Sequence, residues 1–250
     1  MKKYSYKTFR HSKKKSHLKT YFFIFLFLAL ISAAVYFLWF WPGFKIENIS
    51  LADETFVLAQ DFKESVRSFL SEKSINFLPQ NKIFTFPAKK MKDSLQKKFP
   101  EIKNIILKRK PPQEIYFEIE EREKLGVWCQ KDSGKCYFFD NEGIIFHSSP
   151  QMISSLFLTI FCGQEQEISL GKAVIDPVDL EKIIQIKELS EQAGSLNLVS
   201  LNNYNPGAPD FEFVSKLGWR AFFDTQEDLA KQVYVLFQTL EKEIKDKEPQ

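Results

Sequence analysis

Histidine and recognisable catalytic motifs are scarce in this 250-residue sequence. It holds three histidines, and His11 and His17 lie within the first 20 residues, so only His147 remains beyond them. His147 precedes Ser148 and Ser149, but adjacent residues on a strand point to opposite faces and do not form a catalytic pair unaided. The motifs GxSxG, HExxH, GxxxxGK[ST] and GxGxxG are absent. We therefore predict no catalytic residue, no bound cofactor and no enzyme activity.

Cysteine is also scarce, with three residues, Cys129, Cys136 and Cys162. Cys129 and Cys136 flank the turn-forming segment 131–135, so they could face each other across two antiparallel strands. A cross-strand disulfide and a pair of buried free thiols are both open. Three scattered cysteines with one histidine lack the close paired spacing of zinc ligands, so we predict no metal site.

Acidic residues are absent from residues 1–20, and charged residues are absent from residues 21–41. The first segment carries seven lysines and Arg10, and is expected to be a disordered cytoplasmic tail. The second is long enough as a helix to cross the roughly 30 Å hydrocarbon core of a bilayer. Basic flanks are retained in the cytoplasm, so the N-terminus is predicted inside and the remainder outside. A cleaved signal peptide is the alternative, although this apolar run exceeds the usual length of about 7–15 residues.

Beyond residue 20 the chain has 27 basic and 32 acidic residues, a net charge of −5. A nucleic-acid-binding face usually requires an excess of basic residues, so we predict no nucleic-acid partner. The lysines of the tail are explained by topology and by attraction to anionic lipid head groups.

Residues 44–122 have the pattern of a compact α+β domain. Alternation predicts strands over 44–51 and 102–110, and over the segment containing Ile115, Phe117 and Ile119. Apolar residues at helical spacing predict helices over 58–73 and 87–99. The resulting β-α-α-β-β order places two helices on one face of a small sheet.

Residues 124–247 are predicted to be a second, β-rich α+β domain closed by a helix. Short strands are expected over 125–130, 135–139, 143–148, 156–162, 196–201, 211–214 and 218–223. Asp176 and Pro177 predict the start of a helix that reaches residue 192. Thr225 is expected to cap a last helix over 226–244.

The order of these parts resembles the FtsQ/DivIB family of bacterial cell-division proteins, whose first outer domain is of the POTRA type. The most specific stretch is Leu107-x-Arg109-x-x-Pro112-x-x-Ile115-x-Phe117-x-Ile119-x-Glu121-Arg122, similar to the family's strand-turn-strand that ends in Glu-Arg. The family's Asp-x-x-Gly turn is similar to Phe139-Asp140-Asn141-Glu142-Gly143. Its late strand and helix are similar to the segment that runs from Leu217-Gly218-Trp219 through the following helix.

This resemblance implies a non-enzymatic scaffold at the division septum that links early and late division proteins. The implied partners are the small single-span coiled-coil proteins of the FtsB and FtsL type, with further division proteins recruited through the POTRA domain. Family members continue past the last helix into a strand with an Asp-Leu-Arg-aromatic pattern, where the partner adds a strand. That pattern is missing here, so either the sequence is truncated or the edge is built from Trp219, Arg220, Ala221, Phe222 and Phe223.

Two other functions remain open at this stage. POTRA-bearing proteins of secretion or outer-membrane assembly usually carry tandem modules and a membrane barrel, and residues after 125 lack the repeated long alternating strands of a barrel. A membrane-anchored cell-wall enzyme is the second alternative, and loss of function on changing Glu121 or His147 without loss of folding would favour it.

Overall fold

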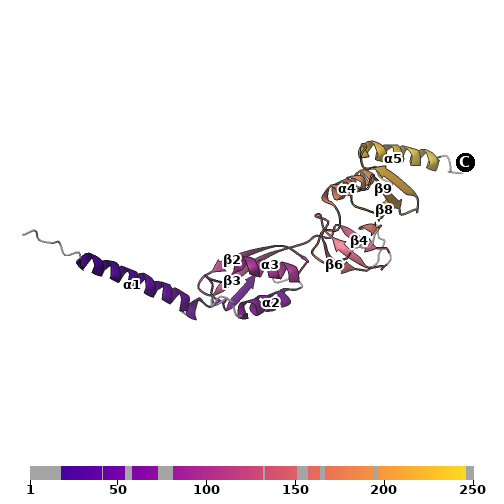
Figure 1. Ribbon diagram of the computed structural model, residues 1–250. Helices are drawn as coiled ribbons and strands as arrows, with labels where there is room; N and C mark the ends of the chain where they lie inside the picture. Colours follow the sequence, from indigo (N-terminus) through magenta and orange to yellow (C-terminus); the bar gives the residue numbers. More distant parts are fainter. Residues whose placement is uncertain are drawn as a thin grey trace, which may run out of the picture.

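The computed structural model of the chain describes residues 18–40, 42–53, 58–72, 81–131, 133–150, 157–163, 167–193 and 196–245. An N-terminal helix is followed along the chain by two α+β parts (Figure 1). We call the part before Glu123 the proximal unit and the part after it the distal unit. The expected mixed α+β fold with one apolar N-terminal helix is confirmed, whereas the predicted tail lies outside the described residues.

The N-terminal helix α1 spans Leu18–Phe40. Its segment Lys19–Phe37 has a mean hydropathy of 2.2 and is long and apolar enough to cross a membrane. Large apolar side chains from Tyr21 to Phe37 are exposed along it, because nothing in the described protein packs against them. An exposed helix that is apolar on all sides suits a lipid environment rather than water.

The proximal unit contains one three-stranded sheet and two helices. Its elements are β1 (Asn48–Leu51), α2 (Ala59–Ser71), α3 (Ala88–Lys98), β2 (Ile102–Lys110) and β3 (Glu114–Glu121). The strand order is β1-β3-β2, with β1 parallel to β3 and β2 antiparallel to it. The predicted strand over 44–51 was too long, because Pro42–Phe44 form a 3₁₀ turn and only Lys45 makes an isolated bridge before β1.

The core of the proximal unit lies between the helices and the sheet. Phe62 of α2 and Met91 of α3 are fully buried, and the Phe62 ring packs edge-on against Phe117 of β3 at 5.2 Å between centroids. Ile115 and Phe117 are buried as their alternation predicted, while Ile119 is only partly buried. The apolar residues predicted from strand alternation and those predicted from helical spacing therefore pack against each other in one layer.

The distal unit is built on a seven-stranded mixed sheet. Its strands are β4 (Gly126–Gln130), β5 (Cys136–Phe139), β6 (Ile145–Ser149), β7 (Leu158–Cys162), β8 (Leu198–Tyr204), β9 (Asp210–Ser215) and β10 (Arg220–Asp224). They lie in the order β10-β9-β8-β7-β4-β5-β6. The central pairs β4–β7 and β7–β8 are parallel, and the outer pairs are antiparallel.

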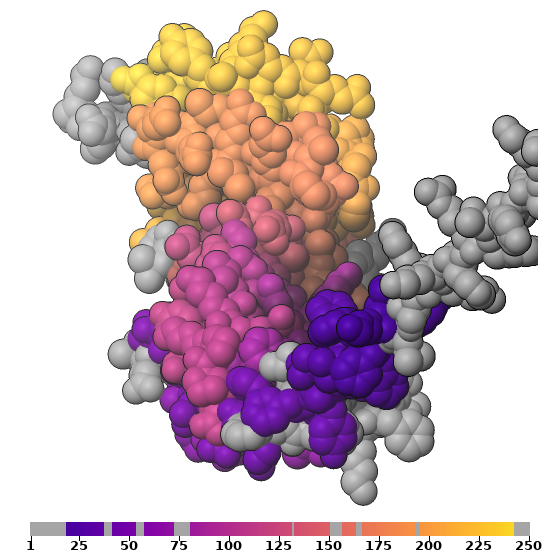
Figure 2. Space-filling view, turned by 90° about the vertical axis from the view of Figure 1, so that its left-hand side faces the viewer, coloured from indigo at the N-terminus to yellow at the C-terminus, as the bar shows by residue number. Residues whose placement is uncertain are grey.

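Both helices of the distal unit pack on one face of this sheet. Leu180 and Ile183 of α4 (Pro177–Gln192) share a buried cluster with Leu229 and Val233 of α5 (Leu229–Lys245). Figure 2 shows the surfaces of these two C-terminal segments, orange and yellow, adjoining at one end of the molecule. The opposite face carries a smaller apolar cluster around Phe138 and the two cysteines of β4 and β5.

Capping side chains set where the two distal helices begin. Asp176 accepts hydrogen bonds from the backbone N–H groups of Val178 and Asp179, as the sequence predicted for α4. The prediction that Thr225 caps the last helix was wrong, because its hydroxyl donates to the carbonyl oxygens of Ala208 and Pro209. Asp228 accepts from the N–H of Lys231 instead, and α5 therefore begins later than predicted.

Arg122 joins the two units directly after β3. Its Nε donates to the carbonyl oxygen of Pro100 at 3.1 Å, and its Nη1 forms ion pairs with Asp140 and, at 3.3 Å, Glu142. Asp140 is 1% exposed, and its other carboxylate oxygen accepts the N–H groups of Glu142 and Ile144. The arginine of the family-like Glu-Arg pair thus holds the β5–β6 turn against the end of α3.

Replacing Arg122 by Met should lower the free energy of unfolding by about 3–5 kcal/mol, because it leaves the buried Asp140 carboxylate unpaired. The solvated pair Lys187–Glu191 on α4 provides a control, and Lys187→Gln should cost no more than about 0.5 kcal/mol. Urea unfolding of the detergent-solubilised chain, followed by tryptophan fluorescence, measures both. Equal effects of the two substitutions would show that the Arg122 contact is not a structural determinant.

Tyr204 ties the end of β8 to the start of α4. Its hydroxyl donates to the Asp179 carboxylate at 3.1 Å and accepts from the N–H of Asp176 at 3.0 Å. Asp179, which is 4% exposed, also accepts from the N–H of Gly207 at 2.8 Å. Burial, followed by the neighbouring carboxylates, raises the pKa of Tyr204 above its ordinary value of 10.0.

Tyr204→Phe should lower the free energy of unfolding by about 1–3 kcal/mol at neutral pH, because the buried Asp179 carboxylate loses one of its donors and the N–H of Asp176 loses its acceptor. In the parent chain the neutral phenol is favoured by folding, so its contribution is complete below pH 10 and declines as the pH rises further. The free energy of unfolding of the Tyr204→Phe variant should therefore fall less steeply above pH 10 than that of the parent chain. Unfolding curves collected from neutral pH to above pH 10 test this, and identical alkaline slopes would contradict it.

Candidate partner-binding edge

Strand β10 forms one outer edge of the distal sheet. It pairs with β9 on one side only, in the register Arg220↔Val214, Phe222↔Glu212 and Asp224↔Asp210. All five sequence-predicted contact residues, Trp219 to Phe223, therefore lie at or just before an edge strand. Such an edge presents backbone N–H and C=O groups that a second chain can pair with.

The phase of the β9–β10 ladder decides which backbone groups face outward. The N–H of Ser215 donates to the carbonyl of Trp219 at 3.0 Å, and that of Thr225 donates to the carbonyl of Pro209 at 2.8 Å. In an antiparallel pair, hydrogen-bonded residues alternate with residues whose backbone groups point away. The backbone groups of Arg220, Phe222 and Asp224 are thus directed away from β9, toward the open edge.

The side chain of Gln232 in α5 binds the backbone of Asp224, the last of these three outward-facing residues. Its Oε1 accepts from the N–H of Asp224 at 2.9 Å, and its Nε2 donates to the carbonyl of Asp224 at 2.9 Å. This side-chain amide satisfies Asp224 in the way a neighbouring strand would. The open stretch of the edge is therefore limited to the backbone of Arg220 and Phe222.

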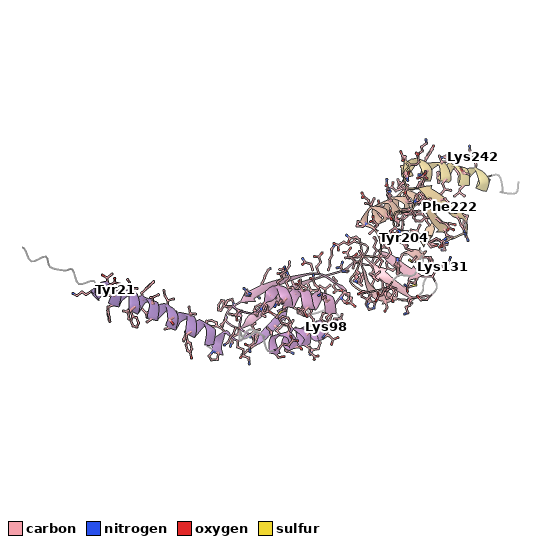
Figure 3. All side chains as sticks on the ribbon, viewed as in Figure 1. Tyr21, Lys98, Lys131, Tyr204, Phe222 and Lys242 are labelled. Carbon is pink, nitrogen blue, oxygen red and sulfur yellow. A yellow bond between two sulfur atoms is a disulfide. The ribbon has the colours of Figure 1, made fainter. Side chains whose placement is uncertain are left out.

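The side chains of β10 alternate between the core and solvent. Ala221 and Phe223 are buried, and the Phe223 ring packs edge-on against Phe213 at 5.6 Å. Phe222 is 63% exposed on the other face, where Figure 3 labels it. Arg220 points to the same face as Phe222 and pairs with Glu212 at 2.9 Å. Among the candidates, Arg220 and Phe222 can contact a partner with their side chains, whereas Ala221 and Phe223 shape the strand from inside.

The helix beside this edge adds a second exposed apolar residue. Val235 lies one turn after Gln232 on α5, so the two share one flank of the helix, and Val235 is 53% exposed. A strand added to β10 would therefore lie beside Val235 on the face of the sheet that the helices cover, and beside Phe222 on the opposite face. Sequence reasoning missed Gln232, because a glutamine in a helix gives no signal until the fold brings it to a strand end.

The other candidate residues lie away from this edge. The structure joins Cys129 and Cys136 by a disulfide across β4 and β5, with 4.1 Å between their Cα atoms, and Cys162 is a buried free thiol. His147 is on β6 at the opposite edge of the sheet, and its Nδ1 lies 3.1 Å from a Glu101 carboxylate oxygen. Within the residues that the structure describes, no group of three or more His, Cys, Asp or Glu residues could hold a metal ion.

The described chain thus combines a helix long and apolar enough to cross a membrane with two α+β units, the second of which has an open strand edge. The chain is 23% identical over 196 residues to the cell division protein FtsQ of Rickettsia prowazekii (strain Madrid E), which covers 77% of the chain and 67% of that relative. No protein-family model matches the chain.

This match confirms the resemblance to FtsQ that the sequence motifs indicated. Together with α1, it supports a cell-division protein held at a membrane.

The geometry of the cysteines predicts a definite labelling pattern. Denatured without reductant, the chain should take up one alkyl group, at Cys162, and after reduction three. Intact-mass spectrometry of protein isolated with a thiol-blocking reagent in the lysis buffer measures this. Three groups without reductant would show that Cys129 and Cys136 remain thiols in the cell.

Proposed function

We propose that the chain is a non-enzymatic scaffold of the bacterial division machinery. It links early and late division proteins at the septum and helps to control septal wall synthesis. Its N-terminal tail lies in the cytoplasm, residues 21–41 span the membrane, and both outer units lie on the far side. In this proposal, residues 44–122 are a POTRA-type domain and residues 124–247 are the FtsQ/DivIB-like domain.

The open edge of β10 is the observation that carries the proposal. The backbone groups of Arg220 and Phe222 point outward, and the exposed Phe222 ring lies beside them. A partner of the FtsB/FtsL type, with one span and an outer coiled coil, would add a short strand at this place. The contact with Gln232 stops that strand at Phe222, so its pairing with β10 is short.

A short edge contact is sufficient because the partners share a membrane. Confinement of two anchored chains to one plane raises their effective concentration, so a modest affinity supports a stable complex. The mild net charge of −5 beyond the tail and the absence of recognised catalytic motifs are consistent with a binding role. The proximal unit would recruit further division proteins in the same membrane.

Proline at position 222 tests strand addition directly. The N–H of Phe222 points away from β9, so Phe222→Pro removes an outward donor without breaking the β9–β10 ladder. Phe222→Thr is the matched control, since it removes the ring and keeps the donor. Affinity for the host's own FtsB/FtsL-type proteins, measured with full chains in nanodiscs, should fall about tenfold further for Pro than for Thr.

Cell-based results complete this test. Fluorescently tagged parent chain should concentrate at the septum and restore division in cells depleted of it, whereas Phe222→Pro should not restore division. Equal affinities of the two variants would exclude β10 as the pairing edge. A parent chain that binds no single-span division protein and does not reach the septum would overturn the scaffold proposal itself.

A further inference from the structure

Helix α3 carries an unusual concentration of lysine on its exposed side. Lys89, Lys90 and Lys97 are exposed, and we call this group the lysine stripe. Lys90 and Lys97 lie two turns apart along one line of the helix, and Lys89 lies about 100° around the helix from Lys90. Met91 and Leu95 face the core on the other side. The stripe contains one acid, Asp93, and stands out in an outer region whose net charge is −5.

Some lysines elsewhere in the two units have acidic partners. Lys108 and Lys110 of β2 pair with Glu118 and Glu114 of β3, and Lys187 of α4 pairs with Glu191. Within the described residues, no ion pair or hydrogen bond engages the ammonium groups of the lysine stripe, in contrast to Lys98, which donates to Ser65 at 2.7 Å. The stripe is therefore an exposed cationic surface in which Asp93 is the one acidic residue of α3.

The position of these charges is also unfavourable for the helix itself. Lys89 and Lys90 lie in the first turn of α3, which contains no acidic residue. The N-terminal end of a helix carries a partial positive charge, so cations there reduce helix stability. Stability of the fold does not explain this placement, and such local conflicts are expected where a surface has another role.

A cleft continues the stripe toward the distal unit. Its volume is about 660 Å³, and its walls include Asp93, Gln96 and Lys97 of α3 on one side and Ser169 to Lys172 on the other. Pro100 and Ile102 contribute apolar wall, and Leu170 is 41% exposed. Lys97 and Lys172 place a cation on each side of this partly apolar space.

We infer that the lysine stripe and this cleft form a docking surface for an acidic peptide segment of a partner protein, separate from the β10 edge. Carboxylates of the segment pair with Lys89, Lys90, Lys97 and Lys172, and an apolar side chain of the segment packs against Leu170 and Pro100. Charge complementarity selects this occupant, because the stripe has unpaired cations and the cleft has room beside an exposed leucine.

The test uses the full chain in phosphatidylcholine nanodiscs and a fluorescein-labelled dodecapeptide of Glu-Leu-Glu repeats. The corresponding Gln-Leu-Gln peptide reports contacts that do not depend on charge. The variant K89Q/K90Q/K97Q removes the stripe, and K216Q/K231Q/K242Q removes three exposed lysines from the distal unit as the matched control. The basic tail is present in all chains, so its contribution to peptide binding cancels.

Fluorescence anisotropy should show that the acidic peptide binds the stripe variant about tenfold more weakly than either the parent or the control variant. A photo-reactive group in the peptide should cross-link to residues 169–172. Equal weakening by both triple variants would overturn the inference, because it would show attraction to net charge alone. Weakening of binding to phosphatidylglycerol vesicles only, with peptide affinity unchanged, would assign the stripe to a lipid surface instead and would also overturn it.

Discussion

The largely buried ion pair between Arg122 and Asp140 links the last residue of the proximal unit to the β5–β6 turn of the distal unit. Asp140 holds its own turn with one carboxylate oxygen and Arg122 with the other, while Arg122 also reaches the carbonyl of Pro100. A positive φ of 71° at Gly143 lets this turn close, and a Cβ there would come within 2.8 Å of the Ile175 carbonyl oxygen. Arg122 also lines the cleft beside α3, and the carbonyl of Gly143 accepts from the N–H of Val174 just before α4.

Short-range patterns in the sequence were sufficient to predict the positions of those helices and strands that have strong local signals. Alternation located β2 at Ile102–Lys110, and the Asp176-Pro177 pair located α4 at Pro177–Gln192, as the structure has them. In both cases the determining residues lie within the element or next to it. Thr225 was wrongly predicted as the cap of the last helix because its hydroxyl binds the carbonyls of Ala208 and Pro209, a contact that no local pattern reveals.

Long-range pairing could not be derived in the same way. The parallel pairs β4–β7 and β7–β8 join strands far apart in sequence, and no local pattern encodes that order. The candidate edge depends on it as well, since β10 is open only because the sheet order leaves it last. The sequence prediction included all five residues from Trp219 to Phe223, and only the register with β9 separates those whose backbone points outward from those whose backbone points inward.

The parallel centre of the distal sheet also has a consequence for biosynthesis. Strand β4 appears early in synthesis and can form a hairpin with β5 at once, but its other neighbour, β7, follows much later, and β8 later again. Until those strands emerge, the apolar edge of β4 has no partner, and loop closure must precede any gain from pairing. The nascent distal unit therefore passes through a stage with unpaired hydrophobic strands, during which aggregation competes with folding.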